Sequence, residues 1–151
     1  MANTAAICTS FKVELLNGHH AFGTSVVRGA TTKDTIKAAL FLASASLGAA
    51  TTAYSATGEI SNTGDYTAGG VTVTNATAPN SSGTTAFWTP SAAITLTGVT
   101  FTAVDALLLY NSTQSNKAIA VFNFGSQSIT AGNFTLNMPT NDASTGLLRL
   151  A

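Results

Sequence analysis

The side chains that could carry out a reaction in this chain are few: one cysteine, two histidines and six acidic residues. Cys8 would be a nucleophile if a histidine lowered the pKa of its thiol, and His19 and His20 follow it closely in the sequence. No motif of a cysteine-enzyme type surrounds Cys8, and small buried cysteines are common. We therefore predict a buried Cys8 with a packing role. A lone cysteine also excludes an internal disulfide.

The adjacent histidines, His19 and His20, could bind a metal ion only with help from elsewhere. Neighbouring side chains on extended backbone point in opposite directions, whereas metal sites use spaced ligands such as histidines at positions i and i+4 of a helix. No cysteine or acidic residue lies at a useful offset. We expect a loop that follows a helix, with one ring capping the helix-terminal carbonyls. We predict no metal site and no cofactor.

The acidic residues could support the hydrolysis of a glycan, which needs two carboxyl groups on either side of a sugar bond. They are Glu14, Asp34, Glu59, Asp65, Asp105 and Asp142. Nothing in their spacing favours a catalytic pair. Asp34 and Asp142 lie among turn residues, where Asp stabilises local backbone, and Glu14 and Lys12 are expected to face solvent.

Asp105 is unusual because it lies early in the apolar segment 103–110. It could lie on a face toward solvent or a partner, pair with Lys117 across a hairpin, or be buried. We favour the pairing, because opposite charges on neighbouring strands attract.

The composition favours packing and surface contact over chemistry. Charged residues make up 8% of the chain and its net charge is zero, against about 25% charged residues in average soluble domains. Nucleic-acid binding needs clustered Lys and Arg, and the six basic residues are spread thinly. Low net charge also removes protection against self-association. We predict that the chain is not an enzyme and binds no nucleic acid.

The elements that would position these residues are mostly strands in one domain, residues 1–151. A short N-terminal helix is expected over about 8–17, because Ile7, Phe11 and Leu15 are four apart and Gly18 follows. The apolar run 38–50 indicates a buried strand followed by a loop. It is too short for a membrane span, which needs about 20 apolar residues, and the N-terminus does not read as a signal peptide.

Strand patterns recur from Thr35 onward, separated by turn residues. They occupy residues 35–43, 71–76, 84–89, 94–97, 99–102, 103–110, 117–124, 134–138 and 147–150, with Ile129 as a further strand position. The clearest unit is a hairpin of 103–110 and 117–124 around the polar turn 111–116, stopped by Gly125. About eight strands at this spacing predict a mainly β fold, a β-sandwich or jelly roll.

The aromatic residues divide into two groups. Phe87 and Trp88 lie in a strand pattern and are expected in the core. Tyr54 and Tyr66 lie in loops rich in Gly and Thr and are better candidates for an exposed binding surface.

Three stretches carry a resemblance to a known class of proteins. They are Ser10–His19, the region Leu47–Tyr54 with Gly58–Ser61 and Tyr66–Gly70, and Leu107–Phe124. Together they resemble small virion proteins encoded beside the capsid genes of tailed bacteriophages. The resemblance covers most of the chain and contains no catalytic motif, so no active-site residue is carried over.

The resemblance implies a non-enzymatic capsid decoration or cement protein that bridges major capsid subunits and stabilises the head. It implies a sandwich or jelly-roll domain, a homo-oligomer (dimer or trimer), a location on the capsid surface after synthesis in the host cytoplasm, and no membrane partner. The expected partner contacts are Phe11, His19, His20, Tyr54 and Tyr66. The alternative is a head- or tail-fibre-associated module that recognises host surface glycan through exposed aromatics in a loop pocket.

Overall fold

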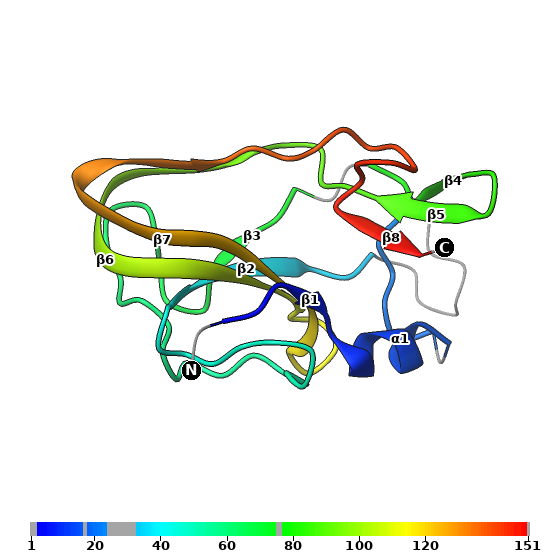
Figure 1. Cartoon of the computed structure of the whole chain (residues 1–151), viewed down its shortest axis with the longest axis horizontal. Coiled ribbons are helices and arrows are strands. Elements are labelled where there is room, and N and C mark those ends of the chain that lie inside the picture. Colours follow the sequence, from blue (N-terminus) through cyan, green and yellow to red (C-terminus); the bar gives the residue numbers. More distant parts are fainter. Residues whose placement is uncertain (1–2, 17, 24–32, 75–76, 151) are drawn as a thin grey trace.

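The described part of the protein is mainly β, with two antiparallel sheets and one short helix (Figure 1). The structure is a computed structural model that describes residues 3–16, 18–23, 33–74 and 77–150. Its elements are β1 (Ala6–Ile7), α1 (Thr9–Leu16), β2 (Ile36–Leu42), β3 (Val71–Thr72), β4 (Asn80–Ser82), β5 (Thr85–Trp88), β6 (Ile94–Asn111), β7 (Lys117–Leu136) and β8 (Leu148–Leu150). The larger sheet has the order β1-β7-β6-β2-β3, and the smaller one has the order β4-β5-β8.

The hairpin of β6 and β7 is the main structural unit. Its pairing runs from Asn111 opposite Lys117 to Ile94 opposite Leu136. Ser115 and Asn116 take left-handed backbone angles in the turn, with φ of 52° and 59°, and the Lys117 amide donates to the Gln114 carbonyl. The predicted hairpin and its polar turn are confirmed.

The predicted end of the second hairpin strand at Gly125 is wrong, because β7 continues to Leu136. The two segments predicted at 94–97 and 99–102 are likewise parts of one strand, β6. Positive φ angles occur at Gly98, Ala103, Gly125 and Ala131, and the pairing register shifts several times between Leu96 and Ala106. Such bulges bend a strand without ending it.

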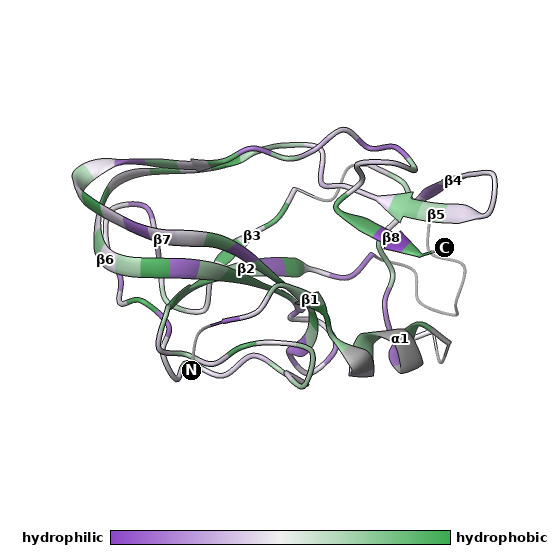
Figure 2. Cartoon of the chain, in the orientation of Figure 1, coloured by the Kyte–Doolittle hydropathy of each residue, from purple (hydrophilic) through white to green (hydrophobic). Residues whose placement is uncertain are grey.

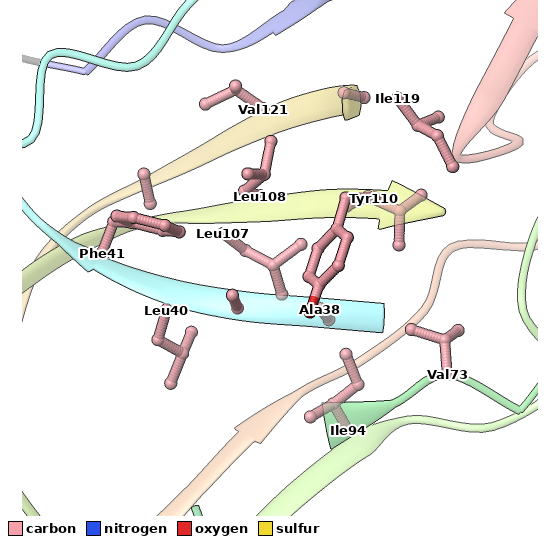
Figure 3. Close-up of a cluster of buried hydrophobic side chains, with 14 of the residues drawn as sticks. Ala38, Leu40, Phe41, Val73, Ile94, Leu107, Leu108, Tyr110, Ile119 and Val121 are labelled. Carbon is pink, nitrogen blue, oxygen red and sulfur yellow. The ribbon is translucent and has the colours of Figure 1, made fainter. Parts of the chain in front are cut away.

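The bulged hairpin turns back on itself, so that its far half runs above the half that pairs with β2 (Figure 1). The apolar core lies on both faces of β2, β6 and β7 (Figure 3). Leu107 and Leu109 line a cavity of about 130 Å³ together with Ile94 and Leu136 from the far half. Because side chains alternate along a strand, Tyr110 lies on the opposite face and stacks on Tyr54. Burial on both faces explains why the strand pattern here is a continuous apolar run.

The helix α1 packs against β7 at the N-terminal end of the chain. The amides of Gly18 and His19 donate to the carbonyls of Leu15 and Glu14 after its last turn. Gly18 has a φ of 68°, a left-handed angle that glycine adopts without strain. Phe11 on this helix is 2% exposed, so the helix contributes to the core.

The smaller sheet packs its apolar residues toward α1. Figure 2 shows hydrophobic residues on β5 and β8 and hydrophilic residues on β4. Phe87 and Trp88 are 8% and 3% exposed, which confirms their prediction as core residues. The Trp88 ring lies 4.8 Å from the Phe22 ring, and its indole N–H donates to the Thr77 carbonyl.

Candidate functional site

A cluster of polar side chains lies where α1 meets the turn end of β6 and β7. One Glu14 oxygen accepts from Lys117 Nζ at 2.9 Å, and the other lies 2.8 Å from His20 Nε2. Burial raises the pKa of Glu14, but the hydrogen bonds from Lys117 and His20 outweigh it, and the net pKa is lowered. The expectation that Glu14 faces solvent is therefore wrong: it is 7% exposed, because two donors replace its water.

Asn111 joins this cluster to Asp34. Its Nδ2 donates to Asp34 Oδ2 at 2.7 Å and lies 3.1 Å from His20 Nδ1. Its Oδ1 accepts from the backbone amides of Thr113 and Gln114, at 3.1 Å each. The hydrogen bonds therefore run without interruption from Lys117 through Glu14, His20 and Asn111 to Asp34, which we call the latch cluster.

The latch cluster holds parts of the fold together, and of its members only the Lys117 side chain is appreciably exposed, at 32%. The His20 side chain is 0% exposed. Burial lowers its pKa, although Glu14 and Asp34 act in the opposite direction. The prediction that a ring at positions 19–20 caps the helix-terminal carbonyls is not met by His20, whose two nitrogens face Glu14 and Asn111.

Cys8 is buried with 0% exposure, as predicted. Its sulfur contacts the Gly48 carbonyl at 3.9 Å. Burial, and secondarily the charge of Glu14, raises the pKa of the thiol to about 11. A thiol with a raised pKa is a poor nucleophile at neutral pH.

A second cluster surrounds Glu59. The hydroxyls of Tyr54 and Tyr66 each donate to its carboxylate at 2.6 Å, and the Gly69 amide donates at 2.8 Å. The Tyr66 hydroxyl also accepts from the Leu40 amide at 2.9 Å. These bonds fasten the loop between β2 and β3 to the edge of β2.

Tyr66 is 1% exposed, so its predicted place on the surface is wrong. Its ring fills the space beside β2 because Glu59 and Leu40 satisfy its hydroxyl. Burial, followed by the hydrogen bond to Glu59, raises the pKa of Tyr54 and of Tyr66. Tyr54 is half-buried and stacks on Tyr110, with ring centroids 4.7 Å apart.

Asp105 lies in a third cluster and not in the pairing with Lys117 that we favoured. It is 6% exposed, which matches the buried alternative. Its carboxylate accepts from the side-chain amides of Asn3 and Asn123. The correction follows from the register, because the residue opposite Lys117 is Asn111.

The remaining acidic residues accept from backbone amides, Asp65 from a distant strand and Asp142 from its own turn. Asp65 accepts from the Thr97 amide at 3.1 Å. Asp142 accepts from the amides of Ser144 and Thr145 at 2.7 Å each, as its place in a turn predicted. These bonds, with that to Thr145 first, lower the pKa of Asp142.

The carboxylates do not form a hydrolytic pair among the described residues. Glu14 and Asp34 share the latch cluster, but His20 and Asn111 lie between them. Both are buried, at 7% and 4% exposure. A glycosidase needs two carboxyl groups that face a bound sugar, and this arrangement does not supply them.

The five predicted contact residues do not form one exposed surface. Phe11, His20 and Tyr66 are buried, while His19 and Tyr54 are half-buried. The structure brings two of them together, with the Phe11 and His20 rings 4.8 Å apart. Aromatic rings next to an apolar sheet contribute to stability by burial. That these five residues contact a partner stays a prediction.

Sequence reasoning missed three asparagines that bind the acidic residues: Asn3 and Asn111, which are buried, and Asn123, which is exposed. Their partners lie far away in the sequence, so no local pattern marks Asn3 or Asn123. Asn111 did carry one signal, its position directly before a polar turn, where Asn commonly binds the following backbone amides.

An apolar groove of about 240 Å³ opens beside the latch cluster, between α1 and the smaller sheet. Its lining includes Phe11, Phe22, Trp88, Leu148 and the ring of His20. Leu150 at its margin is 40% exposed. The groove has few polar groups, so it offers an apolar contact and no reactive centre.

The described residues contain no group of three or more His, Cys, Asp or Glu side chains placed to bind a metal ion. Nor does the described part contain a helix long and apolar enough to cross a bilayer. No protein-family model matches the chain, and neither a curated protein nor a solved structure matches it.

Proposed function

We propose that this chain is a non-enzymatic virion protein of a tailed bacteriophage, a cement or decoration protein that binds the capsid surface and bridges major capsid subunits. The proposal rests on the resemblance of its three stretches to small virion proteins and on one observation in the fold. That observation concerns the long hairpin of β6 and β7, which we call the β6–β7 ribbon. The surface of its far half is uncharged, and one edge of β7 is available for pairing with another strand.

Beyond Lys117 at the start of β7, the exposed part of the ribbon carries no charge. Residues 118–141 contain no Asp, Glu, Lys, Arg or His, and the one charged residue of β6, Asp105, is buried. The exposed positions of the far half of β6 include Thr95, Thr97, Thr100 and Thr102. Such a surface can be covered by a partner without the cost of desolvating charge.

One edge of β7 supports the same function. β1 pairs with β7 only at Ala120 and Val121. From Phe122 to Leu136, that edge pairs with no other strand among the residues that the structure describes. Exposed edges are commonly protected by charges or proline against pairing with another chain. The segment Phe122–Leu136 has bulges but neither a charge nor a proline, so we infer that a capsid subunit or a second copy covers this edge.

The positions of the acidic residues favour a role in protein contacts over a role in catalysis. Glu14, Glu59 and Asp105 are each bound into clusters that hold segments against the sheet. The folded-back ribbon with core on both faces of the larger sheet favours a sandwich-like domain, which we propose as the finer description of the fold. Many copies, self-associated as dimers or trimers, would add their modest contact energies through avidity.

The test is the copy number and position of the protein in purified virions. Quantitative mass spectrometry and a virion reconstruction are expected to find many copies distributed over the shell. A few copies at one vertex, or none, would contradict the proposal. If the protein were instead a fibre-associated glycan binder, its copy number per virion would match the number of fibres.

A pair of variants links this test to the ribbon. Thr130→Lys places a charge on exposed β7, and Thr84→Lys places the same charge on the exposed turn between β4 and β5. The first is expected to lower incorporation into particles while the second leaves it unchanged. Equal incorporation of both variants would exclude the ribbon as the contact surface.

A further inference from the structure

The protonation state of His20 is fixed by its neighbours. Asn111 Oδ1 accepts from two backbone amides in the β6–β7 turn, and its Nδ2 therefore points toward Asp34 and His20. An amide N–H₂ can only donate. His20 Nδ1 must therefore accept from Asn111, and its Nε2–H donates to Glu14. The ring is neutral in this arrangement.

A second proton on His20 would conflict with this arrangement. It would place an N–H on Nδ1 directly against the N–H₂ of Asn111, 3.1 Å away. Rotating the Asn111 amide by half a turn would remove the clash but would place its N–H₂ against the backbone N–H groups of Thr113 and Gln114. Either choice leaves donors facing donors in a buried site.

The charged groups around His20 do not remove the conflict. Glu14 faces it from α1, Asp34 acts on it from the segment before β2, and His19 is its neighbour in the chain. Lys117 already balances the charge of Glu14 at 2.9 Å. Burial of the ring also disfavours a charged form, which agrees with its lowered pKa.

We propose that His20 is a pH-sensitive latch, whose protonation in mild acid releases α1 and residues 18–23 from the end of the β6–β7 hairpin. This inference is independent of the proposed capsid function. Within the latch cluster, Glu14 binds Lys117 and His20 faces Asn111 of the hairpin. Hydrogen bonds between Ala21 and Asp34 also tie residues 18–23 to the segment before β2. Apart from Ile36 opposite Asn111, the β2–β6 pairing lies outside the latch cluster.

Release would change the surface of the molecule. The rings of Phe11 and Phe22 lie 5.9 Å apart, and Phe22 lies 4.8 Å from Trp88. Moving them away uncovers Trp88 and Leu148, which line the apolar groove beside α1. The acid form would therefore present an apolar surface that is covered at neutral pH, and Trp88, the one tryptophan of the chain, reports on it.

The experiment compares the protein at pH 8 and at pH 5 by hydrogen–deuterium exchange, corrected for intrinsic exchange, and by Trp88 fluorescence. Peptides covering α1 and residues 18–23 are expected to lose protection at least about tenfold, since one linked proton changes an equilibrium tenfold per pH unit. Peptides from β2 serve as the internal reference and should keep their protection. Unchanged protection of α1 at pH 5 would overturn the proposal.

Two variants isolate the ring responsible. His20→Gln retains a donor and an acceptor but cannot be protonated in this range, and it is expected to abolish the acid transition. His19→Gln is the matched control and should retain it. An acid transition that persists in His20→Gln would refute the latch.

Nitrogen NMR of histidine-labelled wild-type protein decides the case even if His20→Gln fails to fold. The expected result is an Nε2–H ring at pH 8 that gains its second proton below about pH 6.5, together with the fluorescence change. An Nδ1–H ring at pH 8, or protonation without that change, would also refute it.

Discussion

Replacing Glu59 by Ala is the substitution whose cost follows most directly from the structure. The carboxylate accepts three hydrogen bonds, from Tyr54, Tyr66 and the amide of Gly69. Tyr66 is 1% exposed, and its hydroxyl also accepts from Leu40. Without Glu59, the hydroxyl proton of Tyr66 loses its acceptor in a site that bulk water does not reach.

The size of the loss can be set from these contacts. A buried donor left without an acceptor costs about 1–3 kcal/mol, and a hydrogen bond to a charged group contributes about 1.5–3 kcal/mol. Tyr54 is half-buried, so water can replace most of its bond, and we assign the main cost to Tyr66. We expect Glu59→Ala to lower the free energy of unfolding by about 3 kcal/mol. Glu59→Gln should cost about half as much, because its amide oxygen can still accept one of the hydroxyls.

Urea unfolding followed by circular dichroism measures this difference, provided that the denaturant slope stays constant. A double-mutant cycle with Tyr66→Phe isolates the pair and should give a coupling energy of about 1–2 kcal/mol. A loss below about 0.5 kcal/mol, the range of ordinary surface substitutions, would refute the reasoning. The loop between β2 and β3 would then be held by its apolar contacts alone.

Three further outcomes are expected. A thiol reagent should label native Cys8 only through opening of the fold, because burial raises its pKa to about 11; fast labelling at pH 8, compared with the urea-unfolded chain, would contradict this. Lys117→Met should lower the free energy of unfolding by about 1–3 kcal/mol, since it removes one donor of buried Glu14, and adding Glu14→Gln should restore part of it; urea titrations of both variants check this. Tyr54 and Tyr66 have raised pKa values in the fold, so the unfolded chain loses these protons first and stability should fall as the pH rises past about 10; a shallower fall in Tyr66→Phe is the check.

The centre of the fold was predictable because its signals are local. The apolar runs on either side of the turn 111–116 indicate a hairpin, and the structure contains it. Its length was not predictable in the same way. Gly98 and Gly125 read as strand ends, yet in the structure they are bulge positions at positive φ inside continuous strands. A glycine in a strand pattern signals either a turn or a bulge, and only the partner strand decides between them.

The polar clusters were beyond local reasoning for a different reason. Glu14 and Lys117 are 103 residues apart in the sequence, and His20 and Asn111 are 91 apart. A helical pattern places Glu14 on one face, but it does not say that another segment covers that face. Asp105 shows the same limit: Asn123 reaches it through a hairpin register that only the exact turn length sets, and Asn3 lies 102 residues away in the sequence.

The central claim is that the uncharged β6–β7 ribbon is the contact surface of a structural protein. Hydrogen–deuterium exchange of the free protein and of the same protein in purified particles tests it most directly. The account predicts that amides of Phe122–Leu136 exchange much more slowly in the particle, while those of Ile36–Leu42, already buried and paired in the free protein, are unchanged. Equal exchange of the ribbon in both samples, with new protection confined to other segments, would contradict it.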